Sequence, residues 1–425
     1  MSPARSCALA VVRRVFEQGA YADRALAAEA RHDGLDSRER ALAMRIAYGT
    51  VQQCRTLDHL GGQLVRRPLP ELEPAVLAGL RIGLYQLLYL DGVAPHAAVN
   101  ESVELVKRAS PGGAGLLNAV LRRAAAEGPA MLAALDDQDP AGASIMHSVP
   151  EWLAELWWRE LGASEARALL RRINQPPESA VRVNTLSRNV EQVARTLGVP
   201  SRGAPGLPEG LVLDAAFDAE GSALWREGAI MPQSRGSMTV ARMLAPQPGE
   251  RILDLCAAPG AKATHLAALM GGDGVVVAVE RNAARARGLE QTVARMHAST
   301  VRLEVGDAAA PRSGEEFDRV LIDPPCSGLG TLQSRPDLRW RATPDGIAEL
   351  SELQSRILSA GAASLRPGGT LVYSVCTISA AESEEVVDRL LAERPGLELE
   401  RTTRLLPHRD GTDGFFIARL RRPAR

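Results

Sequence analysis

Apolar residues recur at helical spacing through the first 130 residues of the chain, and polar residues fill the positions between them. Such spacing places the apolar side chains on one face of a helix, so it predicts helices rather than strands. Asp36 is followed three residues later by Glu39, which is typical of a helix start, and Pro95 marks a second start. Five runs carry the pattern: 7–16, 41–51, 75–90, 97–109 and 115–125. Residues 1–130 are therefore predicted to form an all-α domain.

The pattern becomes mixed in the next part of the chain. Residues 126–144 are rich in Pro, Gly and Asp, which predicts a linker. From residue 145 to residue 240 helical and strand-like runs are interspersed, so we expect a small α+β module. The expected elements are helices at 150–161 and 189–197 and strands at 180–186 and 211–214. Trp152, Trp157 and Trp158 of the first helix are interpreted as packing residues rather than as a platform for stacking bases.

From residue 241 to residue 425 short β-branched runs alternate with turns and helical segments. This alternation predicts a doubly wound, Rossmann-like α/β sheet, so the whole chain is expected to be multidomain, α and α/β. Ligands of such sheets bind beyond the carboxyl ends of the strands, where we therefore look for the chemistry. The predicted strands are 250–255, 274–280, 301–305, 318–323 and 369–375, with a further candidate at 414–420.

Length and composition set the broad class of protein. A chain of 425 residues is too long for one ordinary core, which predicts two or three domains. No window approaches the roughly 18 consecutive apolar residues of a membrane helix, and the first residues lack the apolar core of a signal peptide. We therefore expect a cytoplasmic protein without a membrane partner. The net charge of −1 neither supports nor excludes a nucleic-acid partner.

The chain has five cysteines, which are far apart and never form a C-x-x-C pair. An odd number at such spacing argues against a disulfide framework and against a structural zinc site, so no metal is expected. Two interpretations of the cysteines remain, namely inert buried thiols or participation in chemistry. The five residues are Cys7, Cys54, Cys256, Cys326 and Cys376.

The loop after the predicted strand 250–255 has the properties of a ligand-binding turn. Its small residues let the backbone approach a ligand closely, and the helix that follows favours an anionic group. The next strand ends at Glu280, whose carboxylate can accept both hydroxyls of a ribose, and the one after it leads to Asp307, placed to contact an adenine edge. The loop residues are Cys256, Ala257, Ala258, Pro259, Gly260, Ala261 and Lys262.

The same loop lacks the G-x-G-x-x-G pattern, which disfavours a dinucleotide. A smaller ligand that combines a nucleoside with a carboxylate fits better, and S-adenosylmethionine is the predicted cofactor. The alternative is a tight structural turn without a ligand.

Two cysteines follow two predicted strands of this sheet. Cys326 lies in an Asp-Pro-Pro-Cys segment that begins at Asp323, and Cys376 comes directly after strand 369–375. A buried core cysteine is expected inside a strand or on an apolar helix face, so this placement favours a chemical role. From these residues alone, either cysteine could be the nucleophile.

Thiols on this rim suit methylation at carbon 5 of cytosine. Carbon 5 is a poor nucleophile, but addition of a thiolate at carbon 6 turns the ring into an enamine-like species that attacks a methyl donor. Asp323 could hydrogen-bond or protonate the ring at N3 and N4. A second cysteine could help to remove the carbon 5 proton before the first one leaves.

Three motifs give the chain a family resemblance. DLCAAPGAKATH (254–265), IDPPCSGLG (322–330) and YSVCT (373–377) resemble the motifs of RNA cytosine-5 methyltransferases, which include the Sun/Nop2 proteins. HAAVNESVELVKR and GLLNAVLRR resemble the NusB-like RNA-binding domain of bacterial 16S rRNA methyltransferase B proteins. HSVPEWL, RVNTL and DGFFIARL match the same group in order, so the resemblance covers nearly the whole chain.

The resemblance implies roles for particular residues. Cys376 would be the nucleophile and Cys326 would promote product release, while residues 256–262, Glu280, Asp307 and Asp323 would contact the cofactor. The implied substrate is cytosine 967 of unassembled 16S rRNA. The implied domains are a NusB-like domain over 1–130, a small module over 145–240 and a methyltransferase domain over 241–425. We expect a monomer.

Several positions depart from the family pattern. Ala261 replaces a second glycine, Glu280 stands where Asp is commoner, and Pro324 replaces the usual Ala. Gln333 and Ser334 replace an Arg pair, and Ser234 replaces an Asp that commonly follows Gln. These last departures bear on RNA contacts. Three arginines could supply phosphate contacts instead, or could form a merely solvated basic face: Arg335, Arg339 and Arg341.

Two other functions compete with this prediction. Enzymes that methylate exocyclic amines also carry Asp-Pro-Pro, but they stack the base on a following aromatic residue and need no thiol, whereas Cys326 stands at that position here. A non-catalytic RNA-binding or assembly factor is the second alternative, although a pure binder needs neither the cofactor loop nor the two cysteines. Transfer of a methyl group to RNA separates the enzymes from the binder.

Overall fold

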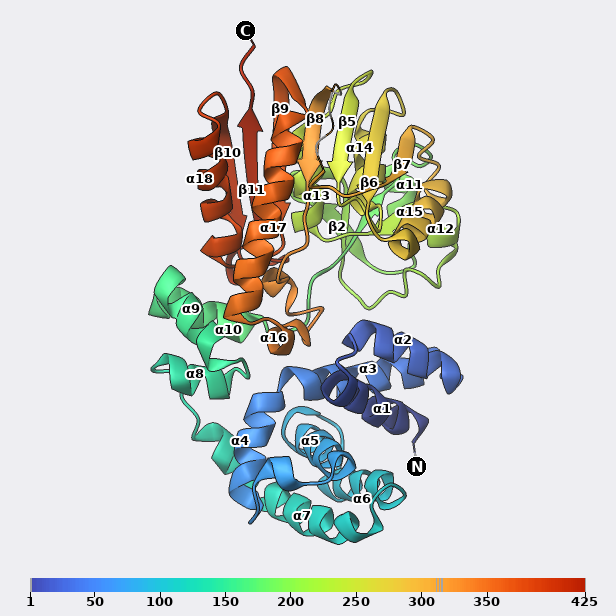
Figure 1. Ribbon diagram of the computed structural model, residues 1–425. Coiled ribbons are helices and arrows are strands. Elements are labelled where there is room, and N and C mark those ends of the chain that lie inside the picture. Colours follow the sequence, from blue (N-terminus) through green and yellow to red (C-terminus); the bar gives the residue numbers. More distant parts are fainter. Residues whose placement is uncertain (1, 311, 313, 315, 425) are drawn as a thin grey trace. The chain divides into compact units, whose positions relative to one another are not determined.

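The computed structural model describes residues 2–310, 312, 314 and 316–424, and the chain divides into two compact units (Figure 1). The helical unit consists of Met1–Gln175 and Leu332–Arg341. The sheet unit consists of Pro176–Thr331 and Ala342–Arg425. Across the described residues, no helix has both the length and the apolar character that crossing a bilayer requires.

The helical unit confirms the helices predicted from the N-terminal pattern. Asp36 caps α3, where its carboxylate accepts a hydrogen bond of 2.8 Å from the Glu39 amide, and Pro95 begins α6. Within residues 1–130 the helices α2 and α4 were not predicted, and in the rest of this unit α8, α10 and α16 were not predicted. The helices are α1 (Pro3–Gln18), α2 (Ala22–His32), α3 (Ser37–Gln52), α4 (Cys54–Leu64), α5 (Pro74–Tyr89), α6 (Pro95–Lys107), α7 (Pro111–Ala133), α8 (Pro140–Met146), α9 (Glu151–Leu161), α10 (Ala163–Arg172) and the short α16 (Leu338–Arg341).

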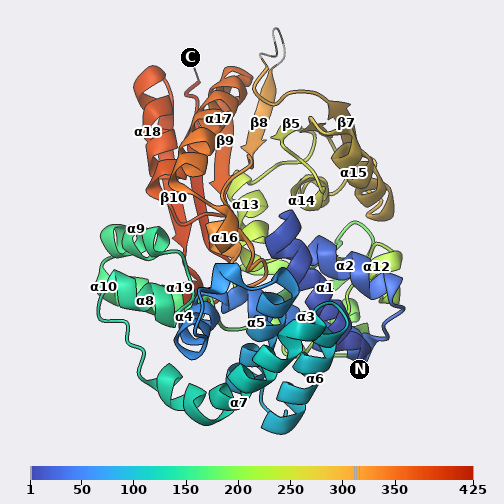
Figure 2. The same cartoon turned by 60° about the horizontal axis from the view of Figure 1, so that its bottom comes forward.

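One core holds the first seven helices of this unit together. Helix α5 is apolar around most of its circumference and packs against α1, α3, α4, α6 and α7, which surround it in Figure 2. Its Leu84 is fully buried in the same apolar cluster as Ile46 of α3 and Leu117 of α7. A helix that is apolar all round is stable only when it is enclosed, which explains why α5 lies at the centre.

The predicted linker at 126–144 is wrong at both ends, because residues 126–133 belong to α7 and residues 140–144 belong to α8. Helix α7 continues through Gly128 and Pro129 to Ala133, so only residues 134–139 join it to α8. At Gly128 a Cβ atom would come within 2.9 Å of Leu88 Cδ2, so the glycine permits close packing of α7 against α5. This packing outweighs the local cost of Gly and Pro in a helix.

The sheet unit contains a small antiparallel sheet of order β2-β3-β1-β4. The predicted strands at 180–186 and 211–214 and the predicted helix at 189–197 are confirmed, whereas the short β2 and β4 were not predicted. Trp157 is fully buried in α9, as a packing residue should be, and helices α8 to α10 belong to the helical unit. The elements are β1 (Ser179–Val183), α11 (Val190–Thr196), β2 (Ser201–Ala204), β3 (Leu207–Leu213), α12 (Ala223–Arg226) and β4 (Ile230–Pro232).

A seven-stranded sheet of order β10-β11-β9-β8-β5-β6-β7 forms the rest of the sheet unit (Figure 1). The strands β5 to β9 are parallel and β11 is antiparallel to β9 and β10, which confirms the doubly wound prediction. The strands are β5 (Arg251–Leu255), β6 (Val275–Glu280), β7 (Val301–Val305), β8 (Phe317–Ile322), β9 (Leu365–Val375), β10 (Glu398–Leu405) and β11 (Phe415–Arg421).

Helices cover both faces of this sheet and enclose two apolar cores. One face packs against α17 and α18, and the other packs against α13, α14 and α15. The strand order reverses between β5 and β8, and ligands bind at such a switch point. The helices are α13 (Arg235–Leu244), α14 (Ala261–Leu269), α15 (Ala283–Arg295), α17 (Pro344–Ala363), α18 (Glu384–Glu393) and α19 (Pro407–Asp410).

Candidate active site

The loop between β5 and α14 makes a sharp turn at the switch point. Cys256 and Gly260 have φ angles of 67° and 105°, in the left-handed region that favours glycine. A Cβ atom on Gly260 would lie 2.8 Å from Leu289 Cδ1, so glycine is required there for space as well. Ala261, the departure from the family pattern, is the first residue of α14 and takes ordinary helical geometry. Its methyl group is therefore compatible with the turn.

A cavity of about 320 Å³ lies beside this turn. Cys256, Glu280 and Asp307 line it together, although they come from three different strand ends. The Glu280 side chain is buried, and its carboxylate accepts a 2.8 Å hydrogen bond from the Asn282 amide, which fixes its orientation. The structure thus brings the predicted cofactor residues Glu280 and Asp307 to the same cavity.

Asp254 is a buried carboxylate that the sequence analysis did not single out. It borders a second pocket of about 30 Å³, together with residues 256–259, Lys262 and Asp323. Its exposed fraction is 1%, and no described residue donates a hydrogen bond to either of its carboxylate oxygens. Burial and the neighbouring Asp323 charge raise the pKa of Asp254 to about 8. Asp254 lies inside β5, whereas the predicted ligand-binding residues follow the ends of the strands, so no sequence pattern pointed to it.

S-adenosylmethionine fits the residues around the two pockets. An unpartnered buried carboxylate is costly unless a ligand supplies a donor or a positive charge, and this cofactor carries an ammonium group. Asp254 would hold that group, while Glu280 and Asp307 would face the nucleoside in the larger cavity. Cys256 borders both pockets, so one extended ligand can occupy them together.

The two predicted cysteines lie in contact. Cys326 follows β8, Cys376 follows β9, and their Sγ atoms are 3.4 Å apart. The hydrogen bond with Cys376, burial and the negative charges of Glu382 and Asp323 together hold the pKa of the Cys326 thiol well above its usual range. Cys326 therefore retains its proton in the resting site.

Asp323 is held next to this pair by two donors. Lys262 Nζ lies 2.6 Å from Asp323 Oδ2, and the Ser374 hydroxyl donates a 2.9 Å hydrogen bond to Oδ1. Burial acts to lower the pKa of Lys262, but the charge of Asp323 and its hydrogen bond outweigh burial and raise that pKa. The site thus combines a fixed carboxylate, a fixed cation and two thiols.

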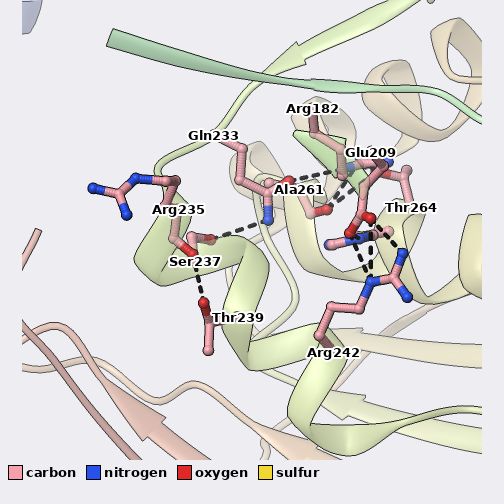
Figure 3. Close-up of polar contacts among 10 residues, drawn as sticks. Arg182, Glu209, Gln233, Arg235, Ser237, Thr239, Arg242, Ala261 and Thr264 are labelled. Atoms are coloured by element: carbon pink, nitrogen blue, oxygen red, sulfur yellow. Dashed lines mark hydrogen bonds and ion pairs between the residues drawn. The ribbon is translucent and has the colours of Figure 1, made fainter. Parts of the chain in front are cut away.

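Behind the cofactor loop, a buried arginine ties α14 to the small sheet (Figure 3). Arg182 of β1 has no exposed surface, and its Nε donates a 2.8 Å hydrogen bond to Gln233 Oε1. Its Nη2 donates to the Ala261 carbonyl at 3.3 Å and to the Thr264 hydroxyl at 2.9 Å. Burial lowers the pKa of Arg182 to about 9. The first turn of α14 is thereby anchored to β1.

A second buried group, Glu209 of β3, lies beside Arg182 in Figure 3. Its carboxylate accepts hydrogen bonds from Arg242 and from His265 Nε2, the latter at 2.6 Å. Although burial acts to raise the pKa of Glu209, these hydrogen bonds outweigh it and lower that pKa. Burial lowers the pKa of His265 to about 4. Glu209 thus supplies negative charge near the buried Arg182 guanidinium.

The arginines considered for RNA contacts have other partners. Arg339 has no exposed surface, and its Nη1 donates to the Ser148 carbonyl at 3.0 Å and to Asn174 Oδ1 at 2.9 Å. Both interpretations of Arg339, as a phosphate contact and as a solvated residue, are therefore wrong. Arg335 and Arg341 place their guanidinium carbons 5.8 and 4.0 Å from the centre of the Tyr21 ring.

The other departures also have structural roles. Gln333 Nε2 donates a 3.0 Å hydrogen bond to the Gln175 carbonyl within the helical unit. Ser234 caps α13, where its hydroxyl accepts from the Ser237 amide at 3.3 Å. Serine and aspartate are both favoured caps, so the Ser234 departure preserves the helix start.

Three protein-family models match the chain. The model for 16S rRNA methyltransferase RsmB/F matches residues 241–421, the NusB family model matches residues 2–126, and the RsmF/B-like ferredoxin-like domain matches residues 149–220. The probable ribosomal RNA small subunit methyltransferase B of Synechocystis is 36% identical over 449 aligned positions, which cover 99% of this chain and 100% of that protein.

Two solved structures are similar to the structure of this chain. The crystal structure of PH0851 matches with a TM-score of 0.84 and 28% identity, over 99% of both chains. The crystal structure of NSun6 from Pyrococcus horikoshii with SFG matches with a TM-score of 0.60 and 26% identity, over 65% of this chain and 99% of that one. The similarity to PH0851 therefore extends over the whole length and fold of the chain.

Proposed function

This chain belongs to the family of ribosomal RNA small subunit methyltransferase B proteins, and we propose that it methylates carbon 5 of a cytosine in 16S rRNA. Membership of this family supports the coarser part of the function, which is S-adenosylmethionine-dependent methylation of ribosomal RNA. The choice of carbon 5 rests on one observation, the 3.4 Å contact between Cys326 and Cys376 beside Asp323. Methylation of an exocyclic amine needs no thiol, so that alternative leaves the pair unexplained.

Each residue of the pair has a separate task in this proposal. Cys376 attacks carbon 6 as a thiolate, which forms a carbon–sulfur bond and moves ring electrons toward carbon 5. Asp323, oriented by Lys262 and Ser374, acts in its carboxylic acid form. It donates its proton toward cytosine N3 and accepts a hydrogen bond from the N4 amine, which draws electrons away from carbon 6. When bound, S-adenosylmethionine supplies the methyl group that carbon 5 receives.

The covalent adduct must then be resolved. Cys326 first releases its own proton to solvent and then accepts the carbon 5 proton as a thiolate. The ring double bond re-forms, and the bond between carbon 6 and Cys376 breaks with Cys376 leaving as a thiolate. A thiol that holds its proton tightly becomes a strong base once ionised, and burial beside Cys376 gives Cys326 this character. The assignment of nucleophile and helper follows the family resemblance, because the geometry treats the two sulfurs alike.

We further propose that the substrate is unassembled 16S rRNA, with cytosine 967 as the target, and that the enzyme acts as a monomer. The match to the NusB family over residues 2–126 supports an RNA-binding role for the helical unit. We propose that residues 256–262, Glu280, Asp307 and Asp323 form the cofactor site. We include Asp254 as well, because it borders the smaller of the two pockets.

Substitution of each cysteine tests the reaction. Cys376→Ala is expected to abolish 5-methylcytosine formation and to leave cofactor binding intact, because the thiol is not needed for that binding. Cys326→Ala is expected to accumulate a denaturation-resistant RNA–protein adduct, because attack proceeds while release stalls. Cys7→Ala, at a buried thiol of α1 remote in sequence from the site, is the matched control.

The product is measured by bisulfite sequencing of ribosomal RNA from cells with and without the gene, complemented by each variant. Methylation at the wild-type rate by Cys376→Ala would refute the covalent mechanism. An unchanged pattern of 5-methylcytosine after loss of the gene would refute the ribosomal substrate.

A further inference from the structure

A buried glutamate lies immediately behind the two thiols. Glu382, at the end of the short helix η3 (Ala380–Glu382), has no exposed surface. Its Oε1 accepts hydrogen bonds from the Ser327 amide at 2.8 Å and from Gln354 Nε2 at 3.1 Å. Its Oε2 accepts from the hydroxyls of Ser327 and Thr377, the latter at 2.9 Å. Four donors thus converge on one carboxylate.

The partners of Glu382 are the neighbours of the two cysteines. Ser327 follows Cys326 in the loop after β8, and Thr377 follows Cys376 in the loop after β9. The hydroxyls of Ser327 and Thr377 also contact each other at 2.8 Å. A single side chain therefore joins the two loops that carry the thiols, at the residue next to each sulfur-bearing one.

The backbone of Glu382 is fixed as firmly as its carboxylate. The Tyr373 hydroxyl donates a 2.7 Å hydrogen bond to the Glu382 carbonyl, and its oxygen lies 3.2 Å from Gln354 Oε1. Burial and nearby negative charges keep the pKa of Tyr373 well above its usual value, so the phenol remains a donor. Tyr373 lies in β9 and Gln354 lies in α17. Their hydrogen bonds therefore fix the position of Glu382 relative to the large sheet and to a helix that covers it.

A buried carboxylate is costly to maintain unless its lone pairs are satisfied. Glu382 meets this condition with charge-assisted hydrogen bonds, which are stronger and more directional than neutral ones. An apolar side chain would fill the same space without that cost, but it would leave the Ser327 and Thr377 donors free to turn. The carboxylate is thus explained by the positions that it imposes on the two loops.

We propose that Glu382 is a positioning residue that holds Cys326 and Cys376 at their contact distance and thereby speeds resolution of the covalent RNA adduct. The inference rests on the proposed function for its catalytic consequence only. The geometric part, the spacing of the two sulfurs, can be measured without RNA and without a cofactor.

The geometric test uses phenylarsine oxide, which condenses with two nearby thiols to give a cyclic dithioarsinite and one water. The reagent bridges two sulfurs without bringing them to the roughly 2.05 Å of a disulfide. Its affinity therefore reports how closely the two sulfurs are held before the reagent binds. Wild-type protein is expected to bind one equivalent at Cys326 and Cys376, located by peptide mass spectrometry, and Cys326→Ala is expected to lose that chelation.

Glu382→Gln is the informative variant, because its amide presents two hydrogens where the carboxylate accepts. The amide carries no charge and accepts through only one oxygen, so the charge-assisted hydrogen bonds that hold the two loops weaken. Arsenical affinity is therefore expected to fall about tenfold or more, as small misplacements of paired groups produce. Thr377→Val removes one hydrogen bond at nearly constant volume and is expected to have a smaller effect in the same direction. Glu385→Gln is the matched control, because Glu385 is exposed on α18.

The catalytic test measures the adduct. With 16S rRNA and S-adenosylmethionine, Glu382→Gln is expected to turn over about 10- to 100-fold more slowly and to accumulate denaturation-resistant adduct, as Cys326→Ala does. General loss of folding would instead lower adduct and product together. If Glu382→Gln misfolds, Thr377→Val carries both tests.

Two outcomes overturn the inference. Folded Glu382→Gln and Thr377→Val proteins that bind the arsenical with wild-type affinity would show that the carboxylate does not set the sulfur spacing. Weakened arsenical binding without any adduct accumulation would refute its role in release. If Cys376→Ala still methylates RNA, the proposed function fails, while the arsenical result stands on its own.

Discussion

Asp254 is a residue whose burial has a direct consequence for stability. Its carboxyl group is shielded from water and has no hydrogen-bond partner among the described residues, so the neutral form is favoured in the folded protein. The folded-state pKa of about 8 exceeds the ordinary value of 3.8. The folded protein therefore holds a proton at pH 6 that the unfolded chain releases. The contribution of Asp254 to the free energy of unfolding is therefore greatest below about pH 4, and this contribution is lost as the pH rises toward 8.

Asp254→Asn removes this titration while keeping the shape of the side chain. Between pH 5 and pH 8, the wild-type free energy of unfolding is expected to fall relative to that of the variant, by at most ~1.4 kcal/mol per pH unit. Urea unfolding without cofactor at pH 5, 6, 7 and 8 measures the difference. Glu280→Gln is the control. Parallel stability curves for wild type and Asp254→Asn would contradict the prediction.

At the scale of single residues, the sequence predicted positions better than partners. The rule that ligands bind after strand ends led to Glu280 and Asp307, which share one cavity, and to Cys326 and Cys376, whose sulfurs touch. Their chemical roles stay predictions. Glu382 was not predicted, because its importance depends on hydrogen bonds to residues that are distant in the chain and carry no spacing signal.

At the scale of secondary-structure elements, the hydrogen bonds that join β1 to α14 through Arg182 make a contribution to stability that can be measured. Arg182 reaches from β1 to the first turn of α14, and its hydrogen bonds to Ala261 and Thr264 cannot be replaced by water because the group is fully buried. Lysine lacks the fork of a guanidinium and cannot serve Gln233 and the helix at the same time.

Arg182→Lys is therefore expected to destabilise the protein by about 2–4 kcal/mol, the usual range when buried hydrogen bonds lose a charged partner. Binding of S-adenosylmethionine is expected to weaken as well, because the loop before α14 loses its anchor. Urea denaturation and isothermal calorimetry measure the two effects. Arg202→Lys on β2 is the control, since its guanidinium is about half exposed. Equal stability of the two variants would contradict the prediction.

Two of the elements that the sequence failed to predict were missed for different physical reasons. Strand β10 lies at the edge of the sheet with most of its side chains exposed, so its residues lack the alternating apolar pattern. The end of α7 contains Gly128 and Pro129, which are typical of linkers, and only packing against Leu88 of α5 makes the helix continue. Strong apolar periodicity predicts an element, whereas exposure and tertiary packing hide one.

At the scale of the whole molecule, one segment from the C-terminal half of the chain belongs to the helical unit. Leu332–Arg341 follows the Cys326 loop in the chain, yet it clusters with the helical unit. Arg339 is buried against carbonyls of Gln52 and Ser148, and Trp340 Nε1 donates a 2.7 Å hydrogen bond to the Val51 carbonyl. Linear patterns cannot reveal such a return. The domain bounds 1–130, 145–240 and 241–425 remain a prediction that omits it.

The grouping predicts how a fragment would behave. In a chain that begins at Pro176, every acceptor that Arg339 uses within residues 1–175 is absent, and Trp340 loses its acceptor too. A buried guanidinium without partners is costly, so the segment is expected to open into solvent. Trypsin should then cut after Arg339 and Arg341 at least about tenfold faster than in the full chain, since cleavage follows the population of the open form.

Limited proteolysis followed by mass spectrometry of the fragments measures the two rates. Cleavage after Arg251, which precedes the interior of β5 in the large sheet, is the internal control and is expected to remain slow in both proteins if the sheet unit stays folded. Fast cutting after Arg251 as well would indicate that the fragment unfolds as a whole. Slow cutting at Arg339 and Arg341 in a folded fragment would mean that the segment is held by the sheet unit alone, which contradicts its assignment to the helical unit. Because the segment is joined covalently to the Cys326 loop, selective opening would also predict slower methylation by the fragment than by the full chain.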